Sequence, residues 1–296
     1  MRAGFAVAFV ALTTSACISA PSPLNPSLRG SVGVPHSGVL TAGSELPKSG
    51  AGFTRFRQHS PNYFGGERLV GAIQRVAEKI AKSDPNGAPL VVGDLSASYG
   101  GKIPGHNSHR TGRDVDLLFF YRTSRGAIVT APGFVHVETD GLARVPETGQ
   151  LLMFDAERQW RLFRALLEEP GLGVQFLFVS TTVEALIIDY ARARGEPLEL
   201  IHRAQSVMLE PKDSTPHDDH VHVRVACSPE EAFTGCSGGG PHWEWLDPLP
   251  LPPELDATAL AWAAEDEPLA PLSPLEQNAI LSELSLADAA NERRVE

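Results

Sequence analysis

GHNSHRTGRDVD at residues 105–116 decides the fold when it is read together with HDDHVHVR at residues 217–224. The two stretches hold five of the ten histidines of the chain. Either stretch alone fits an ordinary reading, because a single histidine near a glycine is usually a loop residue and a single aspartate before an apolar run is usually a cap or turn. The two together favour a site that binds a metal ion.

The first stretch runs directly into the apolar residues 115–121, VDLLFFY, which predict a strand. Successive side chains of a strand point to opposite faces. Asp114 and Asp116 therefore share one face, while Val115, Leu117 and Phe119 take the other and face a core.

The second stretch repeats this alternation. His220, His222 and Arg224 fall on one face of a predicted strand, and the three valines between and after them fall on the other. Two strands with an apolar back and a front of imidazoles and carboxylates suit a catalytic zinc ion. Such an ion takes three protein ligands of nitrogen and oxygen type and leaves a fourth position for water.

The N-terminus predicts export. Arg2 is followed by an apolar run over residues 4–12 and by small residues up to Cys17, which is the plan of a secretory signal. The apolar run is shorter than the roughly 20 residues that a membrane-spanning helix needs. Cys17 after Ser15 and Ala16 resembles a lipoprotein cleavage site, so we favour a lipid anchor at Cys17 over simple secretion. We expect the protein in the periplasm, with the outer membrane as the location of a lipidated form.

The remaining chain divides into three parts. Residues 18–52 are rich in Pro, Ser and Gly and predict a flexible linker, residues 53–247 predict the zinc-binding domain, and residues 248–296 predict a largely disordered acidic tail. The net charge of -11 is concentrated at the C-terminal end, because residues 246–296 contain eleven acidic residues and two arginines. No basic cluster predicts binding to nucleic acid.

Apolar periodicity predicts three helices, over residues 67–82, 155–169 and 182–194, with Asp155 as a cap of the second. Further strands are predicted at residues 89–95 and 174–179. Residues 123–150 form a long connection, which predicts either an excursion that faces the substrate or a small additional hairpin. Helices and strands mix without a regular alternation, so the fold class is α+β, with a small, mostly antiparallel sheet that carries the zinc site and is flanked by helices.

Cys227 and Cys236 close a short loop after the second motif, and in an exported chain they predict a disulfide. Zinc binding by this pair is disfavoured, since no third soft ligand accompanies it. Trp243 and Trp245 predict a packing corner in preference to a platform for a sugar ring.

The motifs resemble those of the penicillin-insensitive murein endopeptidases, which belong to the zinc peptidase group that also includes lysostaphin-type and D-Ala-D-Ala peptidases and the hedgehog fold. Besides the two motifs, the likeness includes NYFG at residues 62–65, GDL at residues 93–95 and FLFV at residues 176–179, in the order of the family. It covers about residues 62–227.

The resemblance implies a role for each candidate residue. His109, Asp116 and His222 match the zinc ligands, and His106 matches a residue that touches metal in some members. His220 matches the general base, and His217 matches a further histidine of the catalytic pocket. Independently of the family, Asp114 is a candidate to orient a ligand imidazole, although a hydrogen bond at the start of the strand is an equal alternative.

One departure from the family concerns an additional metal site. Asp140 matches an aspartate of that site, but Ala143 stands where the family has a histidine three residues later. A second metal is therefore not expected.

The implied substrate is peptidoglycan, cut at the D-alanyl to meso-diaminopimelyl cross-bridge without a serine or cysteine nucleophile, and hence insensitive to penicillin. Two alternatives stay open. One is a carboxypeptidase that removes terminal D-Ala from cell-wall peptides, and the other is a zinc-stabilised module that binds the cell wall without catalysis.

Overall fold

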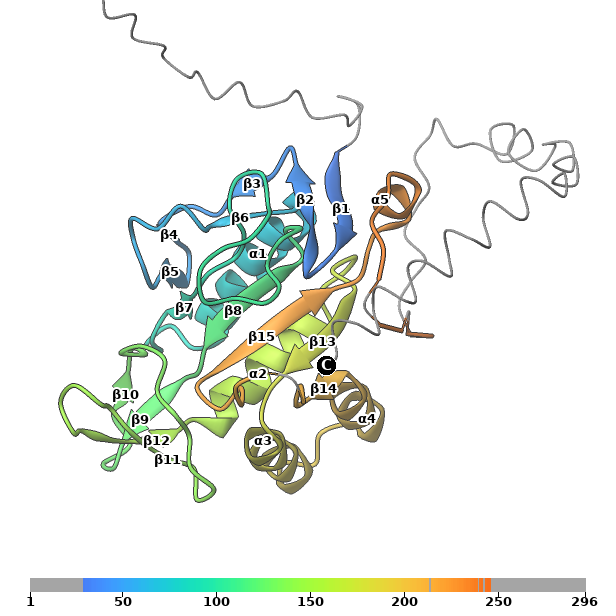
Figure 1. Cartoon of the computed structure of the whole chain (residues 1–296). Coiled ribbons are helices and arrows are strands. Elements are labelled where there is room, and N and C mark those ends of the chain that lie inside the picture. The colour runs from blue at the N-terminus through green and yellow to red at the C-terminus, as the bar shows by residue number, and fades with distance from the viewer. Residues whose placement is uncertain (1–28, 213, 239, 242, 246–296) are drawn as a thin grey trace, which may run out of the picture.

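The computed structural model describes residues 29–245 apart from positions 213, 239 and 242 (Figure 1). The predicted signal segment with Cys17 and the acidic tail beyond residue 247 lie outside the described residues. Within the described part of the chain, no helix combines the length and the apolar character needed to cross a membrane.

The central sheet has seven strands, and four of its six neighbouring pairs are antiparallel. The fold class is therefore α+β with a mostly antiparallel sheet, as the sequence predicts. In spatial order its strands are β14 (Met208–Leu209), β13 (Val174–Phe178), β15 (His220–Val225), β8 (Asp114–Leu118), β7 (Leu90–Val92), β5 (Phe53–Arg55) and β4 (Ser49–Gly50).

The two motif strands, β8 and β15, are antiparallel neighbours at the centre of this sheet (Figure 1). The side chains of Val115, Leu117, Val221 and Val223 are fully buried and belong to the main hydrophobic core. Each such side chain contributes about 1.5–3 kcal/mol when it is removed from water. A shift by one residue in either strand would turn these side chains away from the core, so burial fixes the register.

Two long helices pack behind this apolar face (Figure 1). The four residues that predict the apolar stripe of α1 (Glu67–Ser83) are all buried, and they are Leu69, Ile73, Val76 and Ile80. The N-cap of α2 (Ala156–Leu167) is Asp155, whose side chain accepts a hydrogen bond from the backbone N–H of Arg158. Both predicted helices and the predicted cap are confirmed.

Three more helices lie within the described residues. The prediction for residues 182–194 is confirmed by α3 (Thr181–Ala193), which packs beside α4 (Leu198–Val207) at one end of the sheet (Figure 1). The sequence analysis did not predict α4. The short α5 (Pro229–Phe233) begins with a capping box between Ser228 and Glu231.

The connection over residues 123–150 contributes strands to a second, four-stranded antiparallel sheet, so the additional hairpin is present. The other alternative, an excursion that faces the substrate, stays a prediction. In spatial order this sheet contains β10 (Ile128–Val129), β9 (Tyr121–Thr123), β12 (Leu151–Phe154) and β11 (Leu142–Arg144). Its first strand, β9, follows β8 after two residues, which places this sheet beside the end of the central sheet (Figure 1).

The prediction of a flexible linker is wrong for residues 30–52. β1 (Gly30–Val34) and β2 (Ser37–Thr41) form an antiparallel hairpin, and β3 (Ser44–Glu45) pairs with β6 (Phe64–Gly65). Leu40 and Leu46 in this segment are buried at 1% and 0% exposure. These few apolar side chains anchor a segment whose many small residues resemble a linker in composition.

The hairpin packs on the loop that carries the first motif. The hydroxyl of Ser31 donates to the backbone oxygen of Thr111 at 2.6 Å, and the N–H of Arg110 donates to the oxygen of Pro35 at 3.2 Å. The N-terminal segment is therefore part of the folded domain and supports the loop of the candidate site.

The predicted disulfide is present between Cys227 and Cys236, with their Cα atoms 5.9 Å apart. The tryptophans form the predicted packing corner, because Trp243 and Trp245 stack on each other and pack against the core. The indole N–H of Trp243 donates to the backbone oxygen of Gln175 at 3.0 Å.

Candidate metal centre

All six residues predicted for the site meet on the face of β8 and β15 that is turned away from the helices. Asp116 comes from β8, His220 and His222 come from β15, and the other three lie on the preceding loops: His106, His109 and His217. Their rings form a continuous group, with centroids 4.3 Å apart for His106 and His109, and 5.0 Å apart for His217 and His220. The structure thus brings together residues that are more than a hundred positions apart.

Asp116 is the centre of this group. Its carboxylate oxygens lie 3.2 Å from Nε2 of His109, 3.4 Å from Nε2 of His220, 3.7 Å from Nδ1 of His106 and 3.9 Å from Nδ1 of His222. The antiparallel register explains the arrangement, because His222 is directly opposite Asp116 in the ladder. The alternation of the two strands therefore places His220 and His222 beside Asp116, and the loop before β8 adds His106 and His109.

A glycine approaches the backbone beside Asp116 closely. The N–H of Gly93 donates to the oxygen of Asp116 at 2.7 Å, and a Cβ atom at position 93 would lie 3.0 Å from the Cβ of Asp116. This close approach lets the end of β7 pair with β8 at the site. It also places the next residue, Asp94, beside the candidate centre.

The orientation of His109 is determined by its backbone and by one hydrogen bond. Its φ angle of 62° lies in the left-handed region, which is uncommon for a residue with a side chain and is tolerated at functional sites. Its Nδ1 lies 2.7 Å from the backbone oxygen of Leu95, which leaves Nε2 directed at Asp116. Such a second-nitrogen contact is the usual way in which a protein orients a metal-binding imidazole.

His222 is oriented by the other aspartate of the first motif. Its Nε2 lies 2.8 Å from Oδ1 of Asp114, which also accepts from Nε of Arg224 at 2.7 Å. Burial raises the pKa of Asp114, but the charge of Arg224 and the hydrogen bond with His222 more than offset this and hold the pKa well below its ordinary value. The carboxylate is therefore ionised, and the ring of His222 presents Nδ1 toward Asp116.

The donor set around Asp116 fits a divalent metal ion. Among the described residues, Nε2 of His109 and both carboxylate oxygens of Asp116 are buried without a hydrogen-bond partner. His106, His109 and Asp116 offer ligand atoms that all lie within 4.8 Å of one another. Buried polar atoms of a folded protein are usually satisfied, so this concentration of unsatisfied ligand atoms suits a bound cation.

The three candidate ligands whose ligand atoms lie closest together are thus His106, His109 and Asp116, while His222 lies slightly farther from Asp116. The sequence analysis assigned the opposite order, with His222 as a ligand and His106 as an occasional contact. The assignment of individual ligands stays a prediction, because the geometry is compatible with His109 and Asp116 together with either imidazole.

The other two histidines differ strongly in basicity. Burial lowers the pKa of His220, but Asp116 and Asp219 outweigh it and raise that pKa to about 10. Nδ1 of His220 is hydrogen-bonded to Asp219, which leaves Nε2 facing Asp116. Burial lowers the pKa of His217 to about 4, and the nearby charge of His220 acts in the same direction. His217 is therefore a neutral ring, and His220 is the strongly basic one.

Sequence reasoning assigned no role to three residues that border this centre. Oδ2 of Asp94 lies 3.3 Å from Nε2 of His106 and 2.8 Å from Nη1 of Arg57. The ring of Phe134 meets His220 edge to face at 5.1 Å. The sequence signals for Asp94 were its place after the apolar residues 90–92 and within the GDL segment of the family likeness, while nothing local points to Arg57 or Phe134.

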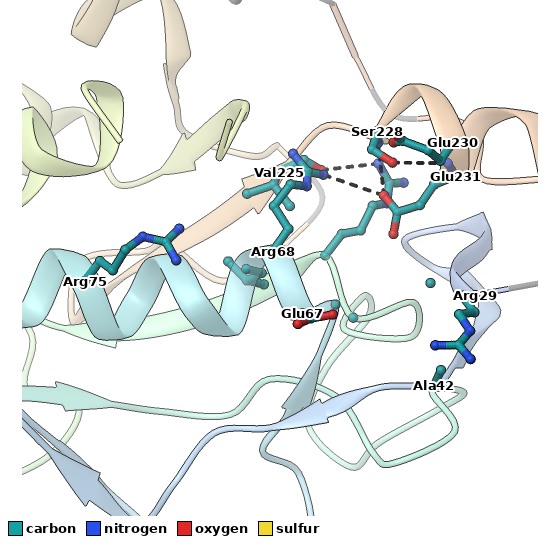
Figure 2. Close-up of a pocket in the computed structure, with 14 residues that line it drawn as sticks. Arg29, Ala42, Glu67, Arg68, Arg75, Val225, Ser228, Glu230 and Glu231 are labelled. Carbon is teal, nitrogen blue, oxygen red and sulfur yellow. Dashed lines mark hydrogen bonds and ion pairs between the residues drawn. The ribbon is translucent and has the colours of Figure 1, made fainter. Parts of the chain in front are cut away.

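A cavity of about 550 Å³ lies away from this centre, beside β1, α5 and the start of α1, and none of the six site residues lines it (Figure 2). Two of its charged groups, Arg68 and Glu231, pair with each other. Arg68 lies 3.6 Å from the carboxylate of Glu231 (Figure 2). This carboxylate also accepts from the backbone N–H of Ser31. The neighbouring N–H of Gly66 donates to the oxygen of Gly112. This region therefore joins the N-terminal hairpin to α1 and to the first motif.

Comparison with known proteins identifies the family. A family model described as penicillin-insensitive murein endopeptidase matches residues 31–241, which is more than half of the chain. The chain belongs to this family. The matched range begins in β1 and includes every residue of the candidate centre. The resemblance to the murein endopeptidases therefore extends from the motifs to almost the whole described part of the chain.

Individual relatives are more distant. The penicillin-insensitive murein endopeptidase of Klebsiella pneumoniae (strain 342) is 31% identical over 119 residues, which cover 38% of this chain and 43% of the relative. The protein of the same name from Escherichia coli O1:K1 / APEC is 30% identical over 120 residues, with the same coverage. The aligned segment thus spans less than half the length of these murein endopeptidases.

Proposed function

We propose that this protein is a zinc-dependent murein endopeptidase that hydrolyses the D-alanyl to meso-diaminopimelyl cross-bridge of peptidoglycan. One observation carries the proposal. The buried carboxylate of Asp116, whose oxygens have no hydrogen-bond partner within the described residues, is surrounded by four imidazoles on one face of the sheet. Family membership and the names of the relatives support peptide cross-bridges as the substrate.

In this proposal His109, Asp116 and His222 hold the zinc ion, with His106 beside them. When bound, zinc polarises the scissile carbonyl and makes water more acidic. The remaining chemistry belongs to side chains of this chain. A ligand set of imidazoles and one carboxylate also suits zinc better than magnesium or calcium, which prefer oxygen ligands.

His220 is the general base. Without a cation, Asp116 and Asp219 hold a proton on this ring; a cation held by Asp116 would offset that negative charge and leave the ring neutral, so that it can accept a proton. Its Nδ1–H donates to Asp219, which fixes Nε2 as the atom that accepts a proton from the attacking water. The contact with Asp219 also stabilises the imidazolium that forms. The proton then passes from Nε2 to the nitrogen of the leaving amine as the amide bond breaks.

His217, or alternatively His106, stabilises the negative charge that develops on the carbonyl oxygen. His217 is neutral, and its Nδ1 is buried without a partner among the described residues, so one of its ring nitrogens is available to donate. Donors already in place for a developing oxyanion commonly contribute a large part of the rate enhancement.

The experiment that tests this function compares three substrates with the intact protein. Purified cross-linked muropeptide dimer, free pentapeptide and whole sacculi are incubated separately, and soluble products are separated by chromatography and weighed by mass spectrometry. Conversion of dimer to two monomers supports the endopeptidase. Loss of one D-Ala from the pentapeptide with an intact dimer would support the carboxypeptidase instead, and binding to sacculi without release of fragments would support the non-catalytic module.

A further inference from the structure

A half-exposed guanidinium lies at the edge of the candidate centre. Nη1 of Arg57 is 2.8 Å from Oδ2 of Asp94, and the side chain of Arg57 is 56% exposed while that of Asp94 is 3% exposed. The same carboxylate also contacts His106 at 3.3 Å and the hydroxyl of Ser60 at 3.4 Å. Asp94 therefore keeps two hydrogen-bond partners without Arg57. Because the side chain of Arg57 is so exposed, its ion pair with Asp94 adds little to the stability of the fold.

Arg57 is connected to the centre through only two side chains. Asp94 bridges it to Nε2 of His106, and Nδ1 of His106 lies 3.7 Å from Oδ2 of Asp116. The guanidinium is therefore one carboxylate away from an imidazole of the site. A group bound at Asp116 and His106 would have its neighbouring atoms within reach of Arg57.

Two aromatic rings contact the guanidinium of Arg57 on its other side. Arg57 lies over the rings of Phe56 and Phe134 at 5.6 and 5.9 Å, and these two rings meet edge to face at 5.5 Å. Phe134 in turn contacts His220. Cation–π contacts and the apolar surroundings restrict the guanidinium and strengthen an ionic contact formed there.

The donors of Arg57 are only partly used. Within the described residues its Nη2 and Nε atoms make no hydrogen bond, although a guanidinium has five N–H groups in a rigid fork. Arg224, the other arginine at this centre, is much less exposed: its Nε contacts Asp114 and its side chain is 14% exposed, compared with 56% for Arg57. A carboxylate is the ligand that such a fork binds best.

We infer that Arg57 binds a free carboxylate of the substrate next to the scissile amide, and that it is a specificity-determining residue. The inference rests on the proposed function. In the D-alanyl to meso-diaminopimelyl bond, the carbon attached to the amide nitrogen also carries a carboxylate. With the carbonyl carbon at the centre and His220 above it, this carboxylate lies on the side of the leaving amine, and Arg57 selects peptides that carry it.

The test uses two cross-linked dimers that differ only at this carboxylate, which is free in one and amidated in the other. The full-length protein is compared with Arg57→Gln and Arg57→Lys, and with Arg192→Gln, which removes an exposed arginine of α3, as the control. For the free dimer we expect Arg57→Gln to raise KM by about 10- to 100-fold with a smaller change in kcat, since a charge-assisted pair is lost. Arg57→Lys should recover part of the loss.

The amidated dimer supplies the decisive comparison. Wild type and Arg192→Gln should prefer the free dimer, and Arg57→Gln should cleave both dimers with similar KM. A preference that survives in Arg57→Gln would overturn the inference while leaving the proposed function intact. If wild type cleaves neither dimer, the proposed function fails and the inference fails with it.

Metal content and thermal unfolding separate substrate contact from a structural role. We expect Arg57→Gln to bind zinc as wild type does and to unfold at a similar temperature. Loss of zinc from both Arg57 variants would mean that Arg57 acts through Asp94 and His106 on the centre, which would overturn a direct contact with the substrate.

Discussion

The carboxylate of Asp114 lies 2.8 Å from Nε2 of His222, so the imidazole presents its other nitrogen to Asp116. The two residues are 108 positions apart in sequence but lie on adjacent strands of the central sheet. The contact determines which nitrogen of His222 is available to the centre. Among the described residues of the group around Asp116, Asp114 contacts only His109 and His222, so it acts on the binding properties of the centre through them.

The first prediction follows from this contact. Asp114→Asn removes the charge that holds His222 and Arg224 while keeping the size of the side chain. We expect zinc affinity to fall by about 10- to 100-fold, the usual effect of losing a residue that orients a ligand. Competition with a chromogenic chelator measures it, with Asp189→Asn on the exposed face of α3 as the control. Equal affinity for both variants would show that Asp114 has no such role.

The second prediction concerns the base. His220→Ala should lower kcat by about 100- to 10,000-fold, the range typical of general acid–base catalysis. Zinc content should stay at the wild-type level, because His220 is not among the three assigned ligands. His202→Ala, an exposed histidine of α4, is the matched control. Unchanged turnover of His220→Ala at full zinc occupancy would refute the assignment of the base.

The third prediction tests whether the N-terminal hairpin belongs to the domain. Leu40→Ala should lower the free energy of unfolding by about 2–5 kcal/mol, because the side chain is 1% exposed and leaves a cavity. Its neighbour Val39 points away and is 37% exposed, so Val39→Ala should change stability by about 0.5 kcal/mol or less. Denaturant unfolding measures both, and a small effect of both substitutions would restore the linker interpretation.

The fourth prediction is a pH dependence at the rim of the site. His136 donates a hydrogen bond to Asp218 at 2.7 Å, and this contact raises the pKa of His136 above its ordinary value. A raised pKa in the folded state means that the contact stabilises the fold fully below the ordinary pKa of about 6.5 and loses this effect as the pH rises through the folded value.

Titration of His136 by NMR measures this. In Asp218→Asn the pKa of His136 should fall back toward its ordinary value, whereas Asp189→Asn should leave it raised. A titration of His136 that does not respond to Asp218→Asn would exclude the contact as the cause.

Local periodicity was enough to predict most of the elements that carry the site. Valines alternate with histidines in β15, and apolar residues alternate with aspartates in β8. These patterns predict which face of each strand is buried. Once both strands are assigned, the histidines and Asp116 must share the uncovered face. The stripe of α1 and the Asp155 cap of α2 are equally local signals, and the structure confirms them.

Features that depend on distant parts of the chain could not be predicted in this way. The hairpin of β1 and β2 contains mainly small residues, and it is ordered by contacts with residues 99–111 and 235–237 that no local pattern encodes. Arg57 and Phe134 reach the centre through loops whose paths depend on the whole sheet. For the same reason the sequence could not rank His106 and His222 as partners of Asp116.

The most direct test of the account is the zinc dependence of cross-bridge cleavage. The full-length protein is freed of metal with a chelator, dialysed, and incubated with cross-linked muropeptide dimer before and after addition of one equivalent of zinc, and the dimer is followed by chromatography with mass spectrometry. We expect the metal-free protein to leave the dimer intact and the zinc-loaded protein to convert it to two monomers. Cleavage at the same rate without metal, or an intact dimer at full zinc occupancy, would contradict the account.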